Sequence, residues 1–380
     1  MDFGYNEEQL MLQRAARDFL ENECPPSFVK EMEFNELGYS PEHWRKVSEL
    51  GWTKLAIPER YGGGGGDLIH LMALYEEFGR AVFPSPHFPS IVQAAQLILA
   101  AGSEEQKREM LPRLTSGEFI GTFAYAEAGF TYDPDPKMTT ATLQGDQVVL
   151  NGTKLFVRDA HVAHYIVCTA ATGDKGITLV VVDKDAPGVT VTATPTLAQD
   201  KQHAVEFQNV VVPKSRILGQ PGEGLAAFNK VHQLSVAVQC AYMVGAMQAI
   251  LDMTVDYAKT RIQFGRPIGS FQAVSHKCSE MLVMLDGSRF LTYEAAWKLK
   301  EGLPCDKELA MAKSWASQCM ESCSYEAHQI HGGIGLSWDY DLQLYSRRGK
   351  LYELTLGDVE YYRDQLGELA AAGELSRPRY

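Results

Sequence analysis

The chain has 380 residues, 45% of them hydrophobic and 22% charged, which is typical of a globular protein large enough for two or three domains. Its net charge of −13 argues against nucleic acid and anionic membranes as partners, because both are bound by clustered Lys and Arg. The acidic start is unlike a targeting peptide, no apolar run approaches the length of a membrane span, and the seven scattered cysteines indicate free thiols in a reducing cytoplasm rather than a metal site.

Helical patterns dominate the first third of the chain. Apolar residues recur at helical spacing over 6–22, 41–51, 67–80, 89–101 and 103–116. The glycine run 62–66 lacks the Lys-Ser/Thr pair of a phosphate-binding loop, and no strand precedes it, so we interpret it as a tight connection between helices. The sequence thus predicts an N-terminal all-α domain over 1–117.

The pattern changes to alternation at about Phe119. Short runs rich in Val and Thr, separated by Gly-Asp, Asn-Gly and Pro-Gly turns, cover 119–126, 140–157, 164–172, 177–185, 189–195 and 203–213. They predict one central antiparallel β domain over 118–222, either a sandwich or a barrel.

Helix returns at about Gly224 and continues to the end of the chain. One very long helix is followed by helical segments at about 271–300, 305–331 and 339–369, with short joints between them. Such an arrangement predicts a C-terminal four-helix bundle over 223–380. The fold class is therefore α+β, in the order helical domain, antiparallel β domain, helical bundle.

Two glycine-containing turns could carry chemistry. At the first, Arg261 and Phe264 stand at a helix end beside Pro267, where a guanidinium can grip a phosphate bidentately. At the second, Gln329 precedes Gly332 and Gly333, which allow close backbone approach to a ligand. Each turn also has a purely structural interpretation. The first can be a helical hairpin with a surface arginine, and the second can be a helix C-cap.

In this α-β-α order, the two turns and four further motifs resemble the acyl-CoA dehydrogenase family over nearly the whole chain. The matching stretches are the Pro-Glu-Arg-Tyr-Gly-Gly loop at 58–63, Glu127-Ala128-Gly129 with Asp133, the Asn-Gly-Thr-Lys turn at 151–154, Gly-Glu-Gly at 222–224, Arg-Ile-Gln-Phe-Gly at 261–265, and Gln329 to Gly335.

The resemblance implies an FAD cofactor, an acyl-CoA substrate and an electron-transfer flavoprotein or similar acceptor. Members remove a proton α to the thioester with a carboxylate and pass a hydride from the β carbon to the flavin. They are dimers or tetramers in which one subunit grips FAD whose ring lies in its neighbour. The implied contacts with the dinucleotide are Arg261 on the pyrophosphate, with Phe264, Gln272, Gln329, Gly332 and Gly333 around it.

This chain departs from the family pattern where the chemistry should occur. Leu356 and Ser235 occupy the two positions at which members carry the catalytic Glu. On the ring side, Ala126 replaces a threonine, and Phe156 and Arg158 replace the Trp and Thr of a Trp-Ile-Thr segment. Just past the usual Glu, Asp358 and Glu360 replace a Thr and a Gln, and Tyr132 stands where a serine touches the thioester or the CoA arm.

Three hypotheses follow. The first makes this chain the base-lacking subunit of a mixed assembly with a homologous subunit, a type that often acts on bulky acyl chains such as sterol side chains. The second is a self-sufficient homo-oligomer with a displaced base. Its candidate carboxylates are Asp358, Glu353, Glu127 and Asp133. The third is a non-catalytic CoA-binding or scaffold protein on the same fold.

Overall fold

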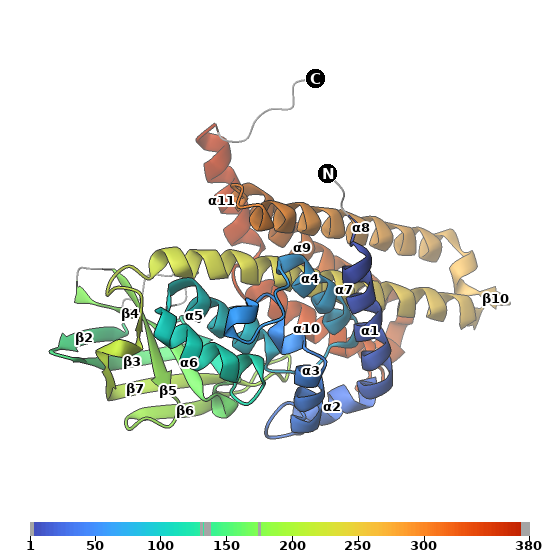
Figure 1. Cartoon of the computed structure of the whole chain (residues 1–380). Helices are drawn as coiled ribbons and strands as arrows, with labels where there is room; N and C mark the ends of the chain where they lie inside the picture. The colour runs from blue at the N-terminus through green and yellow to red at the C-terminus, as the bar shows by residue number, and fades with distance from the viewer. Residues whose placement is uncertain (1–3, 130–131, 133–137, 174–175, 374–380) are drawn as a thin grey trace. The chain divides into compact units, whose positions relative to one another are not determined.

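The computed structural model describes residues 4–129, 132, 138–173 and 176–373 (Figure 1). The chain divides into two compact units. One comprises Met1–Val29, Leu68–Phe83 and Val236–Tyr380, and the other Lys30–Asp67 and Pro84–Ser235. The helix α7 (Leu225–Thr260) runs through both. The predicted boundaries at 117 and 222 cut the chain into three consecutive stretches. The contacts group it differently, because the helices α1 (Glu7–Glu23) and α4 (Leu68–Ala81) belong to the unit of the C-terminal helices.

The second unit contains one sheet of eight described strands. Its strands are β1 Gly121–Ala124, β2 Thr140–Gln144, β3 Gln147–Arg158, β4 Tyr165–Ala171, β5 Ile177–Asp183, β6 Val189–Thr194, β7 Gln202–Pro213 and β8 Ile217–Leu218. Their order is β6-β7-β3-β2-β4-β5-β8, with β1 paired to β4. The predicted strands are present, but β1 pairs with β4 in parallel, as β2 does through Thr140 and Ala171, so the antiparallel prediction is wrong for these two pairs.

That single β2–β4 pair joins two halves of the sheet, which share one core. Alternating side chains of β4 and β5, among them Ile166 and Val180, cluster with Val148 of β3 and with Val205 and Phe207 of β7. Side chains alternate between the two faces of a strand. One shared apolar cluster therefore means that each half of the sheet turns its apolar face toward the other half. This favours the sandwich over the barrel.

Helices complete this unit. They are α2 Pro26–Phe34, which crosses the unit boundary, α3 Pro41–Glu49, α5 Ala95–Ala101, α6 Glu104–Thr115, the π-helix η3 Phe88–Ala94, and the 3₁₀ turns η1 Trp52–Lys54, η2 Glu59–Tyr61, η4 Ala160–Val162 and η6 Lys214–Arg216. Ser103 and Gln106 form a reciprocal cap at the start of α6. The glycine run is the predicted tight connection, because a Cβ on Gly63 would lie 1.8 Å from the Ile57 carbonyl oxygen.

The first unit is helical. Its elements are α1 Glu7–Glu23, α4 Leu68–Ala81, α7 Leu225–Thr260, the short strands β9 Ile262–Gln263 and β10 Arg266–Pro267, η7 Ile268–Ser270, α8 Gln272–Lys300, α9 Asp306–His331, η8 Gly332–Leu336, α10 Leu342–Leu354 and α11 Val359–Ala371. Ion pairs join Lys277 to Glu326 and Lys298 to Glu308, so α8 and α9 run antiparallel (Figure 1). The predicted fourth bundle segment is two helices, α10 and α11.

The helix α7 corrects the statement that no apolar run of the sequence approaches the length of a membrane span. It is long and apolar enough to cross a membrane by length and composition, with a mean hydropathy of 1.6 in its most apolar window. Of that window, 89% is buried within the structure, which is the pattern of a core helix.

Two glycines let α4 and α7 pack backbone against backbone. A Cβ on Gly245 of α7 would lie 1.8 Å from the Glu76 carbonyl oxygen, and a Cβ on Gly79 of α4 would lie 1.9 Å from that of Tyr242. Both distances are far below van der Waals contact with backbone atoms that cannot swing away. The close approach of the two helices therefore depends on both residues.

A Gly245→Ala variant is expected to lose about 3 kcal/mol of unfolding free energy, because the methyl group forces α4 and α7 apart. Urea unfolding followed by circular dichroism would measure the loss. The matched control is Gly367→Ala in α11, where a Cβ meets nothing within 4 Å. That variant should gain up to about 1 kcal/mol from helix propensity, and equal effects of the two changes would contradict the packing argument.

Candidate functional site

The predicted break after α7 is a tight β-hairpin. The strands β9 and β10 pair, and the Ile268 N–H donates to the Arg261 carbonyl at 2.9 Å. The two turn residues, Phe264 and Gly265, have φ of +52° and +80°. A positive φ is costly for a phenylalanine, yet Phe264 is 91% exposed and meets a described ring, that of Phe271, edge-on at 6.1 Å between ring centres, so little packing within the described chain compensates for the strain.

Polar groups of the hairpin face solvent. The Arg261 side chain is exposed, and its guanidinium makes no hydrogen bond or ion pair with any described residue. Gln272, the first residue of α8, is also exposed, and no side chain caps this helix start. A helix N-terminus offers free N–H donors that favour an anion. The hairpin thus presents a guanidinium and an uncapped helix start.

The second predicted turn lies beside the first. The helix α9 ends at His331, whose ring stacks on Tyr257 of α7 at 4.4 Å, and the Tyr257 hydroxyl donates to the His331 carbonyl at 3.4 Å. The neighbouring Gln329 is exposed and unpartnered among the described residues, and a Cβ on Gly332 or Gly333 would meet nothing within 4 Å.

Gly332 has φ +63° and ψ −143°, a conformation that favours glycine. The structure therefore brings Arg261, Gln329 and Gly332 to the same end of the helical unit, where both predicted motifs are open to a ligand or a partner.

The turn between α10 and α11 carries Leu356. Its φ is +60°, and its side chain is only 4% exposed. Side chains from three helices hold the turn and the end of α10. Gln239 of α7 donates to the Thr355 hydroxyl, Tyr362 of α11 donates to the Leu356 carbonyl at 2.7 Å, and the fully buried Lys313 of α9 donates to the Tyr352 carbonyl at 2.6 Å. The strained residue is thus fixed by surrounding structure, as is common at functional positions.

The second position expected to carry a base is Ser235 on α7. Ser235 lies one helical turn before Gln239 on α7, and Gln239 contacts Thr355, the neighbour of Leu356. Ser235 is 1% exposed, and its hydroxyl has no hydrogen-bond partner among the described residues. Neither side chain can serve as the expected carboxylate base.

Three of the candidate carboxylates have structural partners. Asp358 caps the start of α11 by accepting from the Tyr361 N–H at 2.8 Å, and Glu353 pairs with Lys350 at 2.6 Å. Glu127 lies 2.8 Å from the ammonium of the fully buried Lys154, and accepts from the Met138 and Thr139 backbone N–H groups. The fourth candidate, Asp133, lies outside the described residues.

The ion pair makes Glu127 a poor proton acceptor. Burial alone would raise the pKa of Glu127, but the Lys154 ammonium and the Met138 N–H lower it to about 2. A carboxylate with so low a pKa holds a proton weakly and is badly matched to base catalysis near neutral pH. Glu127 instead ties the loop after β1 to β3.

A Glu127→Gln variant is expected to lose about 3 kcal/mol of stability at pH 7, because it leaves the Lys154 charge buried without its partner. The native carboxyl has a folded pKa below its unfolded value, so its contribution is present above about pH 4.5 and is lost as pH falls toward 2. Unfolding free energies measured between pH 7 and pH 3 should show the stability difference between the native protein and the variant shrinking as the pH falls. A stability difference that stays constant over this range would contradict the ion-pair account.

The ring-side replacements lie around β1 and β3. Ala126 is buried, and its carbonyl accepts from the Leu155 N–H at 2.9 Å. Arg158 places its guanidinium 5.3 Å from the centre of the Phe88 ring, and Phe156 is half exposed with φ +56°. Tyr132 is partly buried, and most of the loop around it lies outside the described residues.

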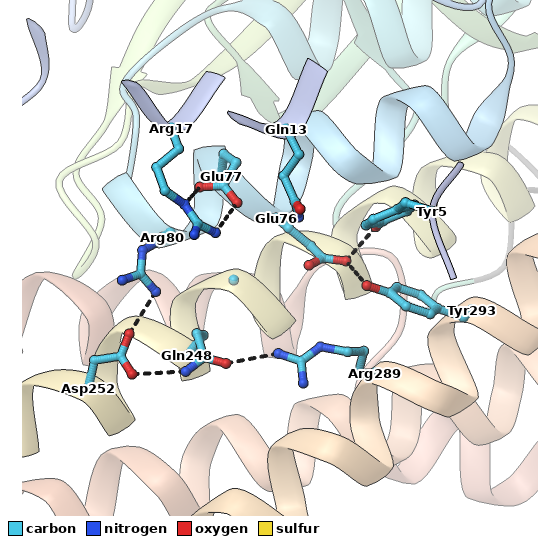
Figure 2. A pocket seen from close by; sticks show the side chains of 11 residues that line it. Tyr5, Gln13, Arg17, Glu76, Glu77, Arg80, Gln248, Asp252, Arg289 and Tyr293 are labelled. Atoms are coloured by element: carbon cyan, nitrogen blue, oxygen red, sulfur yellow. Dashed lines mark hydrogen bonds and ion pairs between the residues drawn. The ribbon is translucent and has the colours of Figure 1, made fainter. Parts of the chain in front are cut away.

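A charged cavity of about 380 Å³ was missed from the sequence. It lies in the helical unit, where α1 and α4 meet α7 and α8. Figure 2 shows its matched pairs, which are Arg17 with Glu77, Arg80 with Asp252, and Arg289 with Gln248, while Tyr5 and Tyr293 both donate to Glu76 at 2.5 Å. Because these charged groups have partners on neighbouring helices, the side chains that line the cavity hold the helices together. The Glu76-Glu77 pair within the mostly apolar α4 was the available signal.

Three family models together match most of the chain. The acyl-CoA dehydrogenase N-terminal domain matches residues 6–118, the middle domain 122–210 and the C-terminal domain 222–370. Among curated proteins, a probable acyl-CoA dehydrogenase of Bacillus subtilis named YngJ is 32% identical over 376 residues, which cover 96% of this chain and 98% of that protein.

Solved structures agree. The ChsE4-ChsE5 complex from Mycobacterium tuberculosis matches with a TM-score of 0.91 and 28% identity, covering 98% of this chain and 99% of the matched chain. Butyryl-CoA dehydrogenase from Megasphaera elsdenii matches with the same TM-score and identity, covering 98% and 100%. The three domain matches in chain order, the relative above 30% identity and the shared fold together mean that this chain belongs to the acyl-CoA dehydrogenase family, whose members are FAD-dependent oxidoreductases.

Proposed function

We propose that this chain is the base-lacking subunit of a heteromeric acyl-CoA dehydrogenase. In this role it holds the dinucleotide part of an FAD whose reactive ring lies in a homologous subunit that supplies the carboxylate. FAD, when bound, supplies the hydride acceptor of the reaction. The observation that carries the proposal is Leu356, a buried apolar side chain with positive φ, which stands at a position of the family's base in a turn fixed by hydrogen bonds.

The open end of the helical unit supports the cofactor part of the proposal. Arg261, Gln272 and Gln329 are exposed polar side chains without partners among the described residues, and Gly332 leaves room for close backbone approach. A guanidinium and an uncapped helix start suit a pyrophosphate, and the glutamine amides suit polar groups of a nucleotide. These residues therefore fit the cofactor that the family uses.

The partners of the described candidate carboxylates support the base-lacking part. Of the nearby acids, Glu353 is paired with Lys350 and Asp358 caps α11, while Ser235 and Leu356 hold the positions of the family base. On the ring side, Ala126 cannot donate a hydrogen bond, and Arg158 lies over Phe88. Both replacements count against a ring held wholly by this chain.

An assembly of two homologous chains is supported by surface and by analogy. Large apolar side chains are exposed on α8, α9 and the segment after α9, namely Val283, Phe290, Trp315, Tyr325, Leu336 and Trp338. Exposed apolar surface of this kind favours contact with another subunit. The ChsE4-ChsE5 structure is itself named as a complex of two proteins. We further propose an electron-transfer flavoprotein or similar acceptor, and a cytoplasmic location that suits the free cysteines.

The test is to change the three candidate carboxylates other than the ion-paired Glu127 within the complex formed with the co-encoded homologue. Glu353→Gln, Asp358→Asn and Asp133→Asn should each leave the turnover of an acyl-CoA within about twofold of the native complex, because the base belongs to the partner. A fall of about 100-fold or more for any one of them would identify that residue as the base. It would favour the self-sufficient enzyme instead.

A further inference from the structure

The charged cavity of Figure 2 is large enough for a small organic molecule. Its volume of about 380 Å³ lies within the usual range of ligand sites in proteins. All of its lining residues belong to the helical unit, on the segment before α1 and on α1, α4, α7 and α8. The cavity therefore lies within one compact unit, and its lining includes neither the Arg261 hairpin nor the Leu356 turn.

The positive and negative charges that line this cavity are not balanced. The charged residues of the lining are Arg17, Arg80, Arg289, Glu76, Glu77 and Asp252. Two of the arginines pair with an acid of the lining, Arg17 with Glu77 at 2.7 Å and Arg80 with Asp252 at 2.8 Å. The third, Arg289, pairs at 2.8 Å with Asp286, which lies outside the lining. Among the described residues, Glu76 is thus the lining acid without an ion pair.

Glu76 is a buried carboxylate with one oxygen still free to accept. It is 7% exposed, and its Oε1 atom accepts from the Tyr5 and Tyr293 hydroxyls, both at 2.5 Å. The Oε2 atom accepts no hydrogen bond from any residue that the structure describes. Burial raises the pKa of Glu76, and the two hydroxyls and the charge of Arg289 offset this only in part. The cavity therefore lacks one positive charge beside Glu76.

The missing charge fits an ammonium group better than a metal ion. A metal ion needs several ligands, and the described part of the chain holds no cluster of three or more His, Cys, Asp or Glu that could bind one. An alkylammonium needs only hydrogen-bond acceptors for its three N–H groups. Figure 2 shows the Gln13 side chain pointing from α1 toward Glu76, and its amide has no hydrogen-bond partner within the described ranges. The Gln13 carbonyl oxygen and Glu76 Oε2 are therefore two available acceptors.

We propose that this cavity binds a small primary amine as its ammonium ion, with Glu76 Oε2 and the Gln13 carbonyl oxygen accepting its N–H groups. The alkyl part of the amine would occupy the rest of the cavity. The bound ammonium would give the buried carboxylate the counter-charge that it lacks, and it would link α1 to α4. This site is separate from the proposed FAD contacts, so it stands or falls independently of the proposed function.

Isothermal titration of the full chain with n-butylamine and with n-butanol tests the proposal. The titration is made at pH 8 in phosphate buffer, because an alkylamine is still protonated at that pH and Tris is itself a primary amine. Butylammonium should bind at least about 10-fold more tightly than butanol, the gain expected from hydrogen bonds to a charged group. It should also raise the melting temperature, because a ligand of the folded chain stabilises that state.

In Glu76→Gln the preference for butylammonium should vanish. The glutamine keeps a side-chain oxygen for the two tyrosine hydroxyls, so the variant tests the charge with little change in shape. The matched control is Glu326→Gln on α9. It removes the same charge outside the cavity, where Glu326 pairs with Lys277, and it should retain the native preference.

Equal affinities of butylammonium and butanol for the native chain would overturn the proposal and leave a proton on Glu76 as the missing positive charge. A preference that persists in Glu76→Gln would overturn it too, because the amine would then be bound elsewhere. A preference lost equally in Glu76→Gln and Glu326→Gln would also contradict the proposal. It would mean a general attraction of cations to an acidic chain.

Discussion

Replacing Leu356 by glutamate is expected to make this chain exchange the α-protons of a bound acyl-CoA with solvent at least about 100-fold faster than the native chain, the usual contribution of a positioned base. The turn already has the required form, because Gln239, Tyr362 and Lys313 hold it from three helices. Burial raises a carboxyl pKa, which makes the new group a better proton acceptor. Deuterium uptake from D₂O, followed by mass spectrometry, measures the rate.

The control for this gain is Leu356→Gln, which matches glutamate in size and polarity but cannot accept a proton. It should exchange at the native rate. Ser235→Glu offers a second position, on α7, where members of the family carry the base, and it should give a gain of similar size. A native rate in both glutamate variants, each shown to be folded, would mean that the turn does not face the α carbon.

Replacing Arg261 by glutamine should weaken FAD binding by the assembled complex about 10- to 100-fold. That is the effect of losing charge-assisted hydrogen bonds to a phosphate. Flavin fluorescence released on dilution measures the change. The melting temperature should not move, because the exposed guanidinium of Arg261 makes no hydrogen bond or ion pair with a described residue.

Arg266 is the matched control for Arg261. It lies on the same hairpin and is also exposed, but its guanidinium stacks 4.1 Å from the centre of the Phe271 ring. Arg266→Gln should therefore retain FAD almost as well as the native complex. Equal losses in the two variants would point to general charge rather than to a specific clamp on the pyrophosphate.

Periodicity predicted most of the elements, because each depends on a local pattern of apolar residues. The long helix α7, the hairpin break and the short β runs all lie close to their expected bounds. The helix α2 was missed, since Pro25 and Pro26 mark a break and the helix has only nine residues. Parallel pairing of β1 with β4 was missed because strands distant in sequence leave no local signal of their partner.

The site was predicted in part for a similar reason. The exposed groups of the Arg261 hairpin and the Gln329 turn stand out in sequence because glycine and proline mark their unusual backbone. The split of the last helical segment at Leu356 was not predicted, since a leucine with positive φ has no sequence signature. Nor were the charge pairs of Figure 2, because charged residues on a helix normally predict a solvated face.

The central claim is that this chain holds only part of a flavin site. The most direct measurement is the flavin content per chain, from the absorption spectrum, of the protein purified alone and with its homologous partner. The account predicts a colourless protein alone and one FAD for each pair of unlike chains in the complex. One FAD per chain in the lone protein, with acyl-CoA dehydrogenase activity, would contradict it.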